Sequence, residues 1–432
     1  MILEFKVENF LSIKDEQVLS FEATSDKHLS EYHVVEIKPG VKILKMAMIY
    51  GANASGKTNI LKAFDFLRDF AVNPREKGQN TGFVPFKPFI SENNEIKNII
   101  NSNSRFGRFE IIFFVNQKKY KYILKIDSLK VIYEKLYFYP KTQPAELFSR
   151  DFNDNIKGYN LKFGSKIKPK KINEEILKTF TLENSSLIST MSKFDIMFEI
   201  KERNDNNIKF SSLKENKQNY VEISNVFDFF KDTNICFKKI SLLSKSIFKD
   251  VIEDPIYYKE YILPKLKKAD FNIIDYEIIN EKIGVENIYK IKFKHKVSNK
   301  KFFYLYDFEE SVGTNLYFGL IAWLGRLNGV NNIWAIDELE SSLHPELVNH
   351  FINTFLYEVK NTNSQLIFTT HNINLLDEEF VRKDIVWFTN KKEDGSTELY
   401  SLADFNIRKE LSFSKAYKNG AFGATPIIDS VY

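Results

Sequence analysis

The chain has 432 residues, with 62 basic against 57 acidic side chains and a net charge of +5. Hydrophobic residues make up 43%, and only 16 glycines and 11 prolines occur, which excludes long disordered tracts and allows a sizeable core. The length exceeds one ordinary domain and predicts two or three lobes. A basic excess this small fits a solvated lysine-rich surface and assigns no partner by itself.

The sequence also limits disulfides, zinc sites and membrane spans. Cys236 is the only cysteine, so no intramolecular disulfide and no cysteine-based zinc site can form. Residues 1–10 alternate charged with apolar side chains and do not resemble a secretory signal. No run of 18 apolar residues appears, so we expect a cytoplasmic protein without a membrane partner.

The first predicted elements surround a glycine-rich loop. Alternation from Leu3 to Phe10 predicts a half-buried strand, and the apolar run from Ile43 to Tyr50 predicts a buried strand that leads into Gly51. Apolar spacings of three and four from Asn59 to Phe70 predict a helix with one buried face. Residues 74–104, rich in Pro, Asn and Gly, are predicted to form a loop excursion.

The middle of the chain divides into two kinds of sequence. Residues 108–139 contain three apolar runs separated by polar turns, which predicts an antiparallel meander of three strands. From about 150 to 285 the chain is polar and rich in Lys and Asn. Helical periodicity over 173–180 and 222–252 predicts a mainly helical lobe there, without the sustained heptads of a coiled-coil arm.

After residue 286 predicted strands alternate with predicted helices, which favours a mainly parallel sheet covered on both faces. The strands are 288–297, 332–336, 365–370 and 385–389, and the helices are 314–327 and 345–359.

Residues 51–58, Gly-Ala-Asn-Ala-Ser-Gly-Lys-Thr, match the phosphate-binding pattern G-x-x-x-x-G-K-[ST] between a predicted strand and a predicted helix. Backbone N–H groups and the helix N-terminus would hold the phosphates. Lys57 would reach the β- and γ-phosphates, and the Thr58 hydroxyl would bind Mg²⁺. The sequence thus predicts an ATP site with Mg²⁺, whose cofactor-binding residues are Gly51, Asn53, Ala54, Ser55, Gly56, Lys57, Thr58 and Asn59.

Two carboxylates follow the apolar strand that ends at Ile336. Asp337 is predicted to bind the metal together with Thr58, and Glu338 is predicted to orient and activate the attacking water. His371 follows the next apolar strand and could donate a hydrogen bond to the γ-phosphate, although a turn histidine is the alternative. His344, next to a helix-starting proline, is more consistent with a structural role.

The segment Glu310-Ser311-Val312-Gly313-Thr314 stands just before a predicted helix. Ser311 and Gly313 at a helix N-terminus make a second candidate anion site, and a plain helix cap is the alternative. In this position the segment resembles the signature loop of ABC-type ATPases, although it departs from the usual Leu-Ser-Gly-Gly-Gln form. The resemblance implies that Ser311 and Gly313 contact the γ-phosphate held by a second copy.

The order of these motifs resembles the compact ABC-type ATPases of the SMC/RecF-like group, and more narrowly the AAA-family ATPases of prokaryotic phage-defence and abortive-infection operons. Residues 5–10, 266–273 and 420–426 fit the same group. The resemblance covers both ends of the chain well and the middle poorly. No glutamine matches the usual Q-loop, and Gln117 lies in an expected hairpin turn.

The resemblance implies an α/β P-loop NTPase of the ABC type, with a mainly parallel sheet flanked by helices, an antiparallel meander and an inserted helical lobe. The predicted division is 1–150 for the first half of the core, 151–285 for the inserted lobe and 286–432 for the second half. It further implies a homo-oligomer, a dimer or larger, with ATP at the interface, and a separately encoded effector such as a nuclease or toxin.

Three functions are compatible with these patterns. The first is the regulatory ATPase of an antiviral defence system, because the nucleotide motifs are complete and no second cluster of carboxylates or histidines resembles a nuclease. The second is a RecF/SMC-like DNA-binding clamp, for which the lysine-rich stretch 165–172 would supply nucleic-acid contacts. A hexameric AAA+ motor is disfavoured, because the motifs follow the ABC order.

Overall fold

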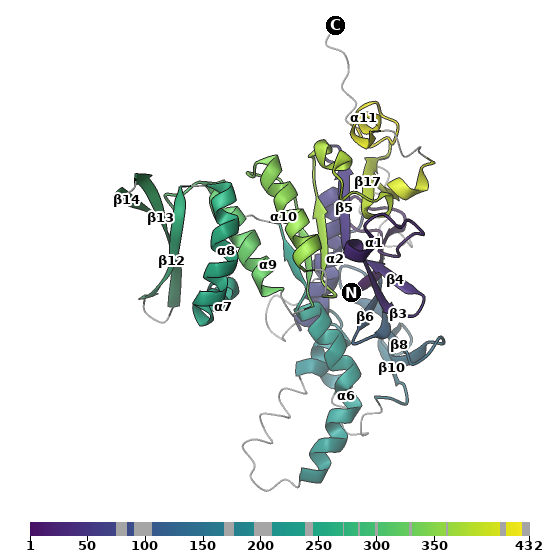
Figure 1. Cartoon of the computed structure of the whole chain (residues 1–432). Helices are drawn as coiled ribbons and strands as arrows, with labels where there is room; N and C mark the ends of the chain where they lie inside the picture. The colour runs from purple at the N-terminus through teal and green to yellow at the C-terminus, as the bar shows by residue number, and fades with distance from the viewer. Residues whose placement is uncertain are drawn as a thin grey trace.

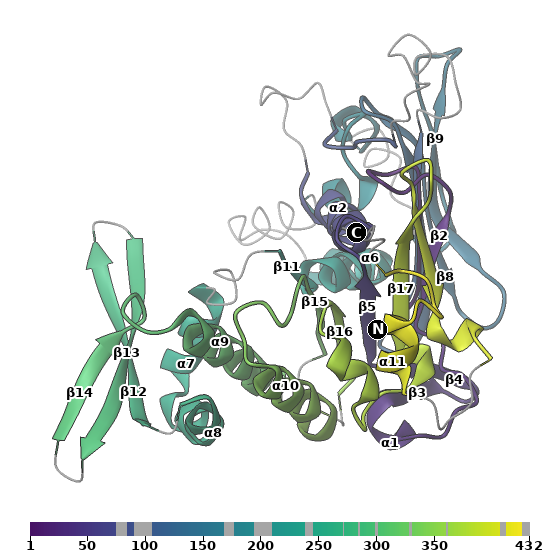
Figure 2. The ribbon, with the colours of Figure 1, turned by 90° about the horizontal axis from the view of Figure 1, so that it is seen from above.

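The computed structural model describes residues 1–74, 84–89, 106–167, 177–193, 210–237, 245–270, 272–283, 286–298, 301–327, 331–359, 362–406 and 412–425. The strands form two large sheets, a three-stranded sheet and a two-stranded sheet (Figures 1 and 2). Most of the loop excursion predicted over 74–104, and residues 168–172 of the lysine-rich stretch, lie outside the described residues. No helix of the described part of the chain is long and apolar enough to cross a membrane.

The core is a six-stranded sheet in the order β11-β15-β16-β5-β17-β18. Its pairs are parallel except for the pair of β17 with β18. The predicted buried strands are buried throughout, because parallel strands have covered faces on both sides. The bounds are Asn234–Cys236 for β11, Ile333–Ile336 for β15, Gln365–Thr369 for β16, Met46–Gly51 for β5, Val386–Lys391 for β17 and Thr397–Ser401 for β18.

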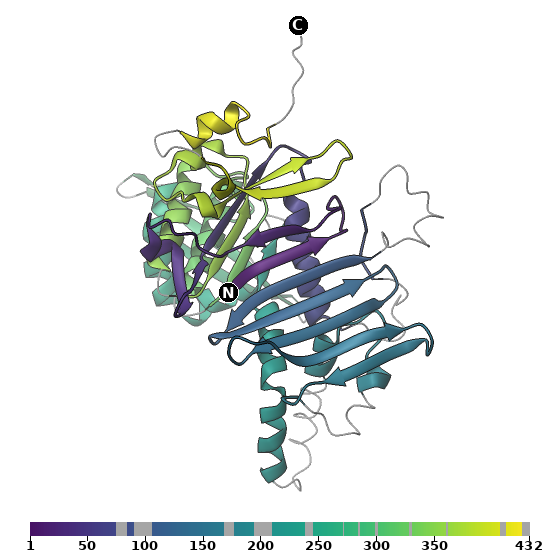
Figure 3. The same cartoon turned by 90° about the vertical axis from the view of Figure 1, so that its right-hand side faces the viewer.

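A seven-stranded antiparallel sheet lies beside the core (Figure 3). It confirms the predicted three-stranded meander and extends it on both sides. Asn116 and Gln117 both have positive φ, as expected for the two-residue turn between β6 and β7. The order is β10 (Gly158–Phe163), β9 (Ala145–Asn153), β8 (Val131–Tyr139), β7 (Lys118–Ile126), β6 (Gly107–Val115), β1 (Ile2–Glu8) and β2 (Gln17–Ser20).

Helix α2 (Lys57–Val72) follows β5 and joins the two large sheets. Its apolar face packs against β1, where the rings of Phe64 and Phe5 lie 5.5 Å apart. Helices α9 (Val312–Arg326) and α10 (Pro345–Glu358) pack beside β15, and the Trp323 ring stacks on Trp334 with centroids 3.6 Å apart. The core is thus closed by helices from both ends of the chain.

The middle of the chain supplies both helices and strands. Helix α6 (Phe210–Lys231) projects away from the sheets in Figure 1 and leads into β11, which pairs with β15 of the core. Helices α7 (Lys245–Glu253) and α8 (Pro255–Ala269) pack with α9 beside a sheet of β12 (Ile273–Ile283), β13 (Glu286–Ser298) and β14 (Lys301–Tyr306).

The predicted boundaries at 150 and 285 do not coincide with breaks between these elements. Residue 150 lies inside β9, which pairs with β8 and β10 in one continuous sheet. Strands β12 and β13, on either side of the predicted boundary at 285, pair antiparallel. Hydrogen bonding therefore continues from strand to strand across both points, and the division into 1–150, 151–285 and 286–432 stays a prediction.

The single strand predicted from Ile43 to Tyr50 is two strands. Strand β4 (Val41–Leu44) pairs with β3 (Val34–Lys38), whereas β5 pairs with β16 and β17. The chain changes partner at Lys45, whose side chain is buried and donates a hydrogen bond of 2.5 Å to the carbonyl of Val359 at the end of α10. The break therefore depends on partners that a continuous apolar run does not identify.

The remaining short elements lie mainly around the edges of the core. They are α1 (Ser30–His33), η3 (Ile373–Asp377), η4 (Lys383–Ile385), η5 (Leu402–Asp404) and α11 (Phe413–Lys418).

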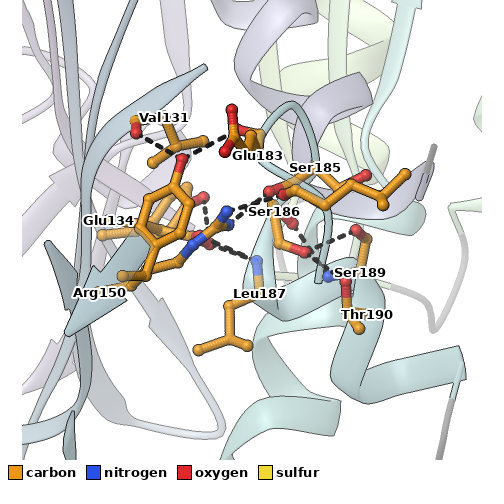
Figure 4. Close-up of polar contacts among 12 residues, drawn as sticks. Val131, Glu134, Arg150, Glu183, Ser185, Ser186, Leu187, Ser189 and Thr190 are labelled. Atoms are coloured by element: carbon orange, nitrogen blue, oxygen red, sulfur yellow. Dashed lines mark hydrogen bonds and ion pairs between the residues drawn. The ribbon is translucent and has the colours of Figure 1, made fainter. Parts of the chain in front are cut away.

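A buried ion pair attaches the segment 182–190 to the antiparallel sheet (Figure 4). Glu134 and Arg150 are almost fully buried and 3.5 Å apart. Both Glu134 oxygens accept the N–H of Leu187 at 2.9 Å, while Arg150 donates to the carbonyls of Ser185 and Leu182 at 2.7 Å. Burial raises the pKa of Glu134, although Arg150 and the Leu187 N–H favour its charged form. The pair is thus satisfied on both sides, as a buried charge requires.

Candidate active site

The phosphate loop connects β5 to α2 at the carboxyl end of the core sheet. Gly51 ends β5 and Gly56 precedes α2 with φ of 106°, a conformation that L side chains rarely adopt. A Cβ at Gly51 would clash with the hydroxyls of Thr389 and Ser55, and one at Gly56 would clash with Thr397. The two glycines are therefore required by close packing against β17 and β18.

The N-terminus of α2 is open to an anion. Gly56 supplies no side-chain cap, so first-turn N–H groups are available to phosphate oxygens. Asn53 and Ala54 are exposed on the loop, and Ala54 has φ of 62°. Asn59, which is predicted to bind the cofactor, donates its side-chain amide to the Ser12 hydroxyl at 2.7 Å and so ties the helix to a neighbouring loop.

Lys57 is buried at the first position of α2. Its ammonium group donates to the carbonyls of Gly51 at 2.8 Å and Ala52 at 3.1 Å, so the lysine folds back over the loop that carries it. Burial lowers the pKa of Lys57 to about 8, while Asp337 and Glu338 oppose the shift. A side chain in this position can reach phosphates bound above the loop.

The structure brings Thr58 and Asp337 together, although 279 residues separate them. The Thr58 hydroxyl lies 3.1 and 3.0 Å from the two carboxylate oxygens of Asp337. Thr369 at the end of β16 donates its hydroxyl to Asp337 at 2.7 Å and accepts the N–H of Glu338 at 2.7 Å. Thr369 had no predicted role, because its only signal in the sequence is its place at the end of the neighbouring apolar strand.

Glu338 has a backbone conformation that glutamate rarely adopts, with φ of 51°. Its side chain is exposed at the tip of β15, and the hydrogen bond from its N–H to Thr369 fixes the strained turn. Strain of this kind costs about 1–3 kcal/mol and clusters at functional sites. After the turn, the N–H of Leu339 donates to the Thr369 carbonyl at 3.1 Å, so the chain stays attached to the end of β16.

His371 lies at the same edge of the sheet. Partial burial lowers its pKa and the Lys57 cation lowers it further, whereas Glu340, Glu338 and Asp337 oppose the shift. Its backbone N–H donates to Glu340 at 2.5 Å, which ties the loop after β16 to the loop after β15. Glu340 had no predicted role, because its partner comes from a distant part of the chain.

Ser311 and Gly313 occupy the start of α9. The Ser311 hydroxyl accepts the N–H of Thr314 at 3.0 Å and therefore caps the helix. A Cβ on Gly313 would lie 2.7 Å from the carbonyl of Ser342, so this glycine permits close contact with the loop that follows Glu338. Among the described residues, no hydrogen bond or ion pair joins Ser311 or Gly313 to residues 51–58 of the same chain.

Glu310 links this segment to the three-stranded sheet. One carboxylate oxygen accepts the N–H of Ser311 at 2.7 Å, and the other lies 2.8 Å from the imidazole of His295 on β13. The His295 ring is buried and stacks on Phe303 with centroids 4.8 Å apart. Neither role was predicted, because the pairing of β13 with β14 creates the contact.

The donor set fits a magnesium–nucleoside triphosphate. The open helix end and the Lys57 ammonium suit phosphates, and Thr58 with Asp337 offers the oxygen ligands that Mg²⁺ prefers. No group of three or more His, Cys, Asp or Glu side chains within the described ranges could hold a metal ion. Magnesium bound here would therefore take most ligands from phosphates and water.

Comparison with solved structures gives weak likenesses. A structure titled "Crystal structure of the SmcHead bound to the C-winged helix domain of ScpA" has 13% identity and a TM-score of 0.40, covering 96% of this chain and 99% of that chain. An Smc head domain with an extended coiled coil, bound to the C-terminal domain of ScpA derived from Pyrococcus furiosus, has 14% identity and a TM-score of 0.39. It covers 97% of this chain and 98% of that chain. No curated protein sequence matches the chain.

The sheet topology shows the fold, and the sequence identifies the family. The mainly parallel core, the loop between β5 and α2 and the adjoining antiparallel sheet confirm the predicted α/β fold with a mainly parallel sheet and an antiparallel meander. A family model described as "AAA domain, putative AbiEii toxin, Type IV TA system" matches residues 46–377, well over half of the chain. The chain therefore belongs to this AAA-domain family.

Proposed function

We propose that the chain binds ATP with Mg²⁺ and hydrolyses it to ADP and phosphate. The contact of the Thr58 hydroxyl with the Asp337 carboxylate carries the proposal, since it joins the phosphate loop to the acidic strand end. Lys57 and the first turn of α2 hold the phosphates, and Thr58 with Asp337 holds the metal. Magnesium bound there neutralises phosphate charge.

Glu338 orients the attacking water and accepts its proton. Its exposed carboxylate directly follows the metal-binding Asp337, and the Thr369 hydroxyl fixes both residues. His371, whose lowered pKa keeps the imidazole neutral near pH 7, donates a hydrogen bond to the γ-phosphate. Ser311 and Gly313 complete the site of a second copy, so that two chains pair head to tail around ATP.

Two variants separate binding from turnover. Lys57→Ala should abolish binding of Mg-ATP, measured by calorimetry, because it removes the buried cation from the loop. Glu338→Gln should keep the affinity within about threefold and lower phosphate release by at least about a hundredfold, because it removes the base. Glu346→Gln, an exposed acid in the first turn of α10, is the control. Normal turnover by Glu338→Gln would show that another group activates the water.

We further propose that this ATPase regulates a separately encoded effector, a nuclease or toxin, in antiviral defence. The family description, which names a toxin and a type IV toxin–antitoxin system, supports the setting. The lack of a metal-binding cluster among the described residues supports the division of labour. Metal-dependent cleavage of DNA or RNA by the purified chain, unchanged in Lys57→Ala, would contradict a separate effector.

A further inference from the structure

One face of the three-stranded sheet is open to solvent (Figure 2). The inner face packs on the helices, where Phe318 of α9 lies 5.0 Å from Tyr276 and 5.8 Å from Phe293. Along β13 the residues between these inner positions point the other way, because side chains alternate across a strand. Ile291, Phe293 and His295 are buried, which places the even-numbered residues of β13 on the outer face.

The outer face of β13 carries a row of four lysines: Lys290, Lys292, Lys294 and Lys296. Alternate residues of a strand lie about 7 Å apart, so the ammonium groups form a regular line. Lys290 is bound to Glu281 at 2.6 Å. Among the described residues, Lys292, Lys294 and Lys296 have no carboxylate within 4.0 Å. Glu277 is the strand partner of Lys292, and Asp275, the strand partner of Lys294, is bound to Lys259 at 2.7 Å. Three cations of the row therefore remain for an external anion.

Aromatic rings run along the edge strand β14 beside this row. Phe302 pairs with Lys296, and Tyr304 pairs with Lys294, so the rings share the outer face with the lysines. The Lys292 ammonium lies 4.5 Å from the Tyr304 ring centre, and the Lys294 ammonium lies 4.5 Å from that of Phe302. Phe302 is still 44% exposed and Tyr304 51% exposed.

Exposed apolar side chains concentrate around this face. Of the fourteen large hydrophobic side chains that are exposed in the described part of the chain, seven lie between Ile288 and Val312. Exposure of aromatic rings to water is unfavourable. Proteins usually cover an open edge strand or use it for binding. The concentration of exposed apolar side chains beside the lysine row therefore points to a ligand that both covers the rings and pairs with the cations.

We propose that this lysine–aromatic face, formed by Lys292, Lys294, Lys296, Phe302 and Tyr304, binds single-stranded nucleic acid. Unpaired bases stack on the two rings, and the phosphates pair with the lysine row. A duplex fits poorly, because its bases are already stacked and cannot reach rings on a flat sheet. Binding at this face needs no ATP, so its test is independent of the proposed hydrolysis.

The test is fluorescence anisotropy with the full chain and labelled oligo-dT and oligo-U of about 20 nucleotides, without ATP. Wild type should bind at least one of the two oligonucleotides. The logarithm of the binding constant, plotted against the logarithm of the salt concentration, should have a slope near −2, because three lysine–phosphate contacts contribute about −0.7 each. Phe302→Ala/Tyr304→Ala should weaken binding by at least about tenfold, because each stacked base is lost. Lys294→Glu/Lys296→Glu should weaken it further and flatten the salt slope.

Lys119→Glu/Tyr139→Ala is the matched control, because that lysine lies 4.8 Å from a ring centre on the antiparallel sheet. It should bind like wild type, and all variants should keep the wild-type melting curve. Three results would overturn the proposal: no binding by wild type, unchanged binding by Phe302→Ala/Tyr304→Ala, or a duplex bound as tightly as a single strand. If Phe302→Ala/Tyr304→Ala lost self-association but bound the oligonucleotides like wild type, the face would be a contact between copies of the chain instead.

Discussion

At the residue scale, Thr369 connects the two carboxylates on which the proposed chemistry depends. Its hydroxyl donates to Asp337 and accepts the N–H of Glu338, so one oxygen fixes the metal ligand and the strained turn. The side chain is fully buried, and water cannot replace either hydrogen bond without rearrangement. Thr369 therefore acts as a positioning residue.

Thr369→Val keeps the shape of the side chain and removes the hydroxyl. We expect ATP affinity to change by less than about threefold and kcat to fall about tenfold, because Glu338 loses its fixed backbone. Steady-state phosphate release and calorimetry measure the two quantities. Thr354→Val, also buried but within α10, where its hydroxyl donates to the His350 carbonyl, is the control and should turn over normally. Equal losses in both variants would assign the effect to packing.

At the element scale, Lys45 joins the β4–β5 junction to the end of α10. Burial lowers the pKa of Lys45 to about 8, from a usual value near 10.5. Between those values the unfolded chain holds the proton and the folded chain does not, so folding becomes more favourable as pH rises through this window. Below about pH 8 both states carry the charge, so the pH dependence ends and the cost of burying the Lys45 ammonium is present in full.

Lys45→Met removes that titration. We compare the free energy of unfolding of wild type with that of the variant. The difference, wild type minus variant, should rise by about 1–2 kcal/mol from about pH 7 to about pH 9.5. Urea denaturation at both pH values measures it. Lys42→Met, on an exposed position of the same strand, should leave the difference flat. A difference that stays constant or falls for Lys45→Met would contradict the buried, easily deprotonated lysine.

Gly313 lets the start of α9 touch the loop after Glu338. In Gly313→Ala the new Cβ would lie 2.7 Å from the Ser342 carbonyl, and backbone must move. We expect kcat to fall at least about tenfold with unchanged ATP affinity, and stability to fall by about 1–3 kcal/mol. Phosphate release, calorimetry and thermal melting are the measurements. Gly158→Ala, whose nearest neighbour would be 3.7 Å away, should behave like wild type.

Sequence patterns predicted the elements whose signal is local. The phosphate loop, the buried core strands and the three-stranded meander follow from glycine spacing and apolar periodicity, and all are present. The division at Lys45, the Thr369 bridge and the His295–Glu310 contact did not follow. Each depends on a partner from another strand or helix, and single-sequence periodicity contains no information on which strands become neighbours.

At the scale of the whole molecule, the proposed site spans two copies. The phosphate loop and the Asp337 carboxylate meet within one copy. In the described part of the chain, Ser311 and Gly313 make no hydrogen bond or ion pair with residues 51–58 of the same copy. In the proposed head-to-tail pair, Ser311 and Gly313 of one copy would contact the phosphates held by the other. Such pairing also makes complementation between two defective copies possible.

Lys57→Ala and Gly313→Ala copies should each be inactive alone. In an equal mixture, about half of the pairs contain one copy of each variant. Each such pair has one intact site, formed by the phosphate loop of the Gly313→Ala copy and the Ser311–Gly313 segment of the Lys57→Ala copy. We therefore expect roughly a quarter of wild-type phosphate release, once pull-down of differently tagged copies confirms exchange. Activity no greater than the sum of the separate variants would contradict a shared site.

The central place of β5 also affects how the protein is made. Its two neighbours, β16 and β17, come about 320 residues or more later in the chain. A ribosome adding about 5–20 residues per second needs roughly 15–65 seconds to deliver them. Until then the strand before Gly51 lacks the hydrogen-bonding partners that fix the loop. We expect a nascent chain that stops before Gln365 to be inert towards nucleotide, which prevents a half-made copy from competing for ATP.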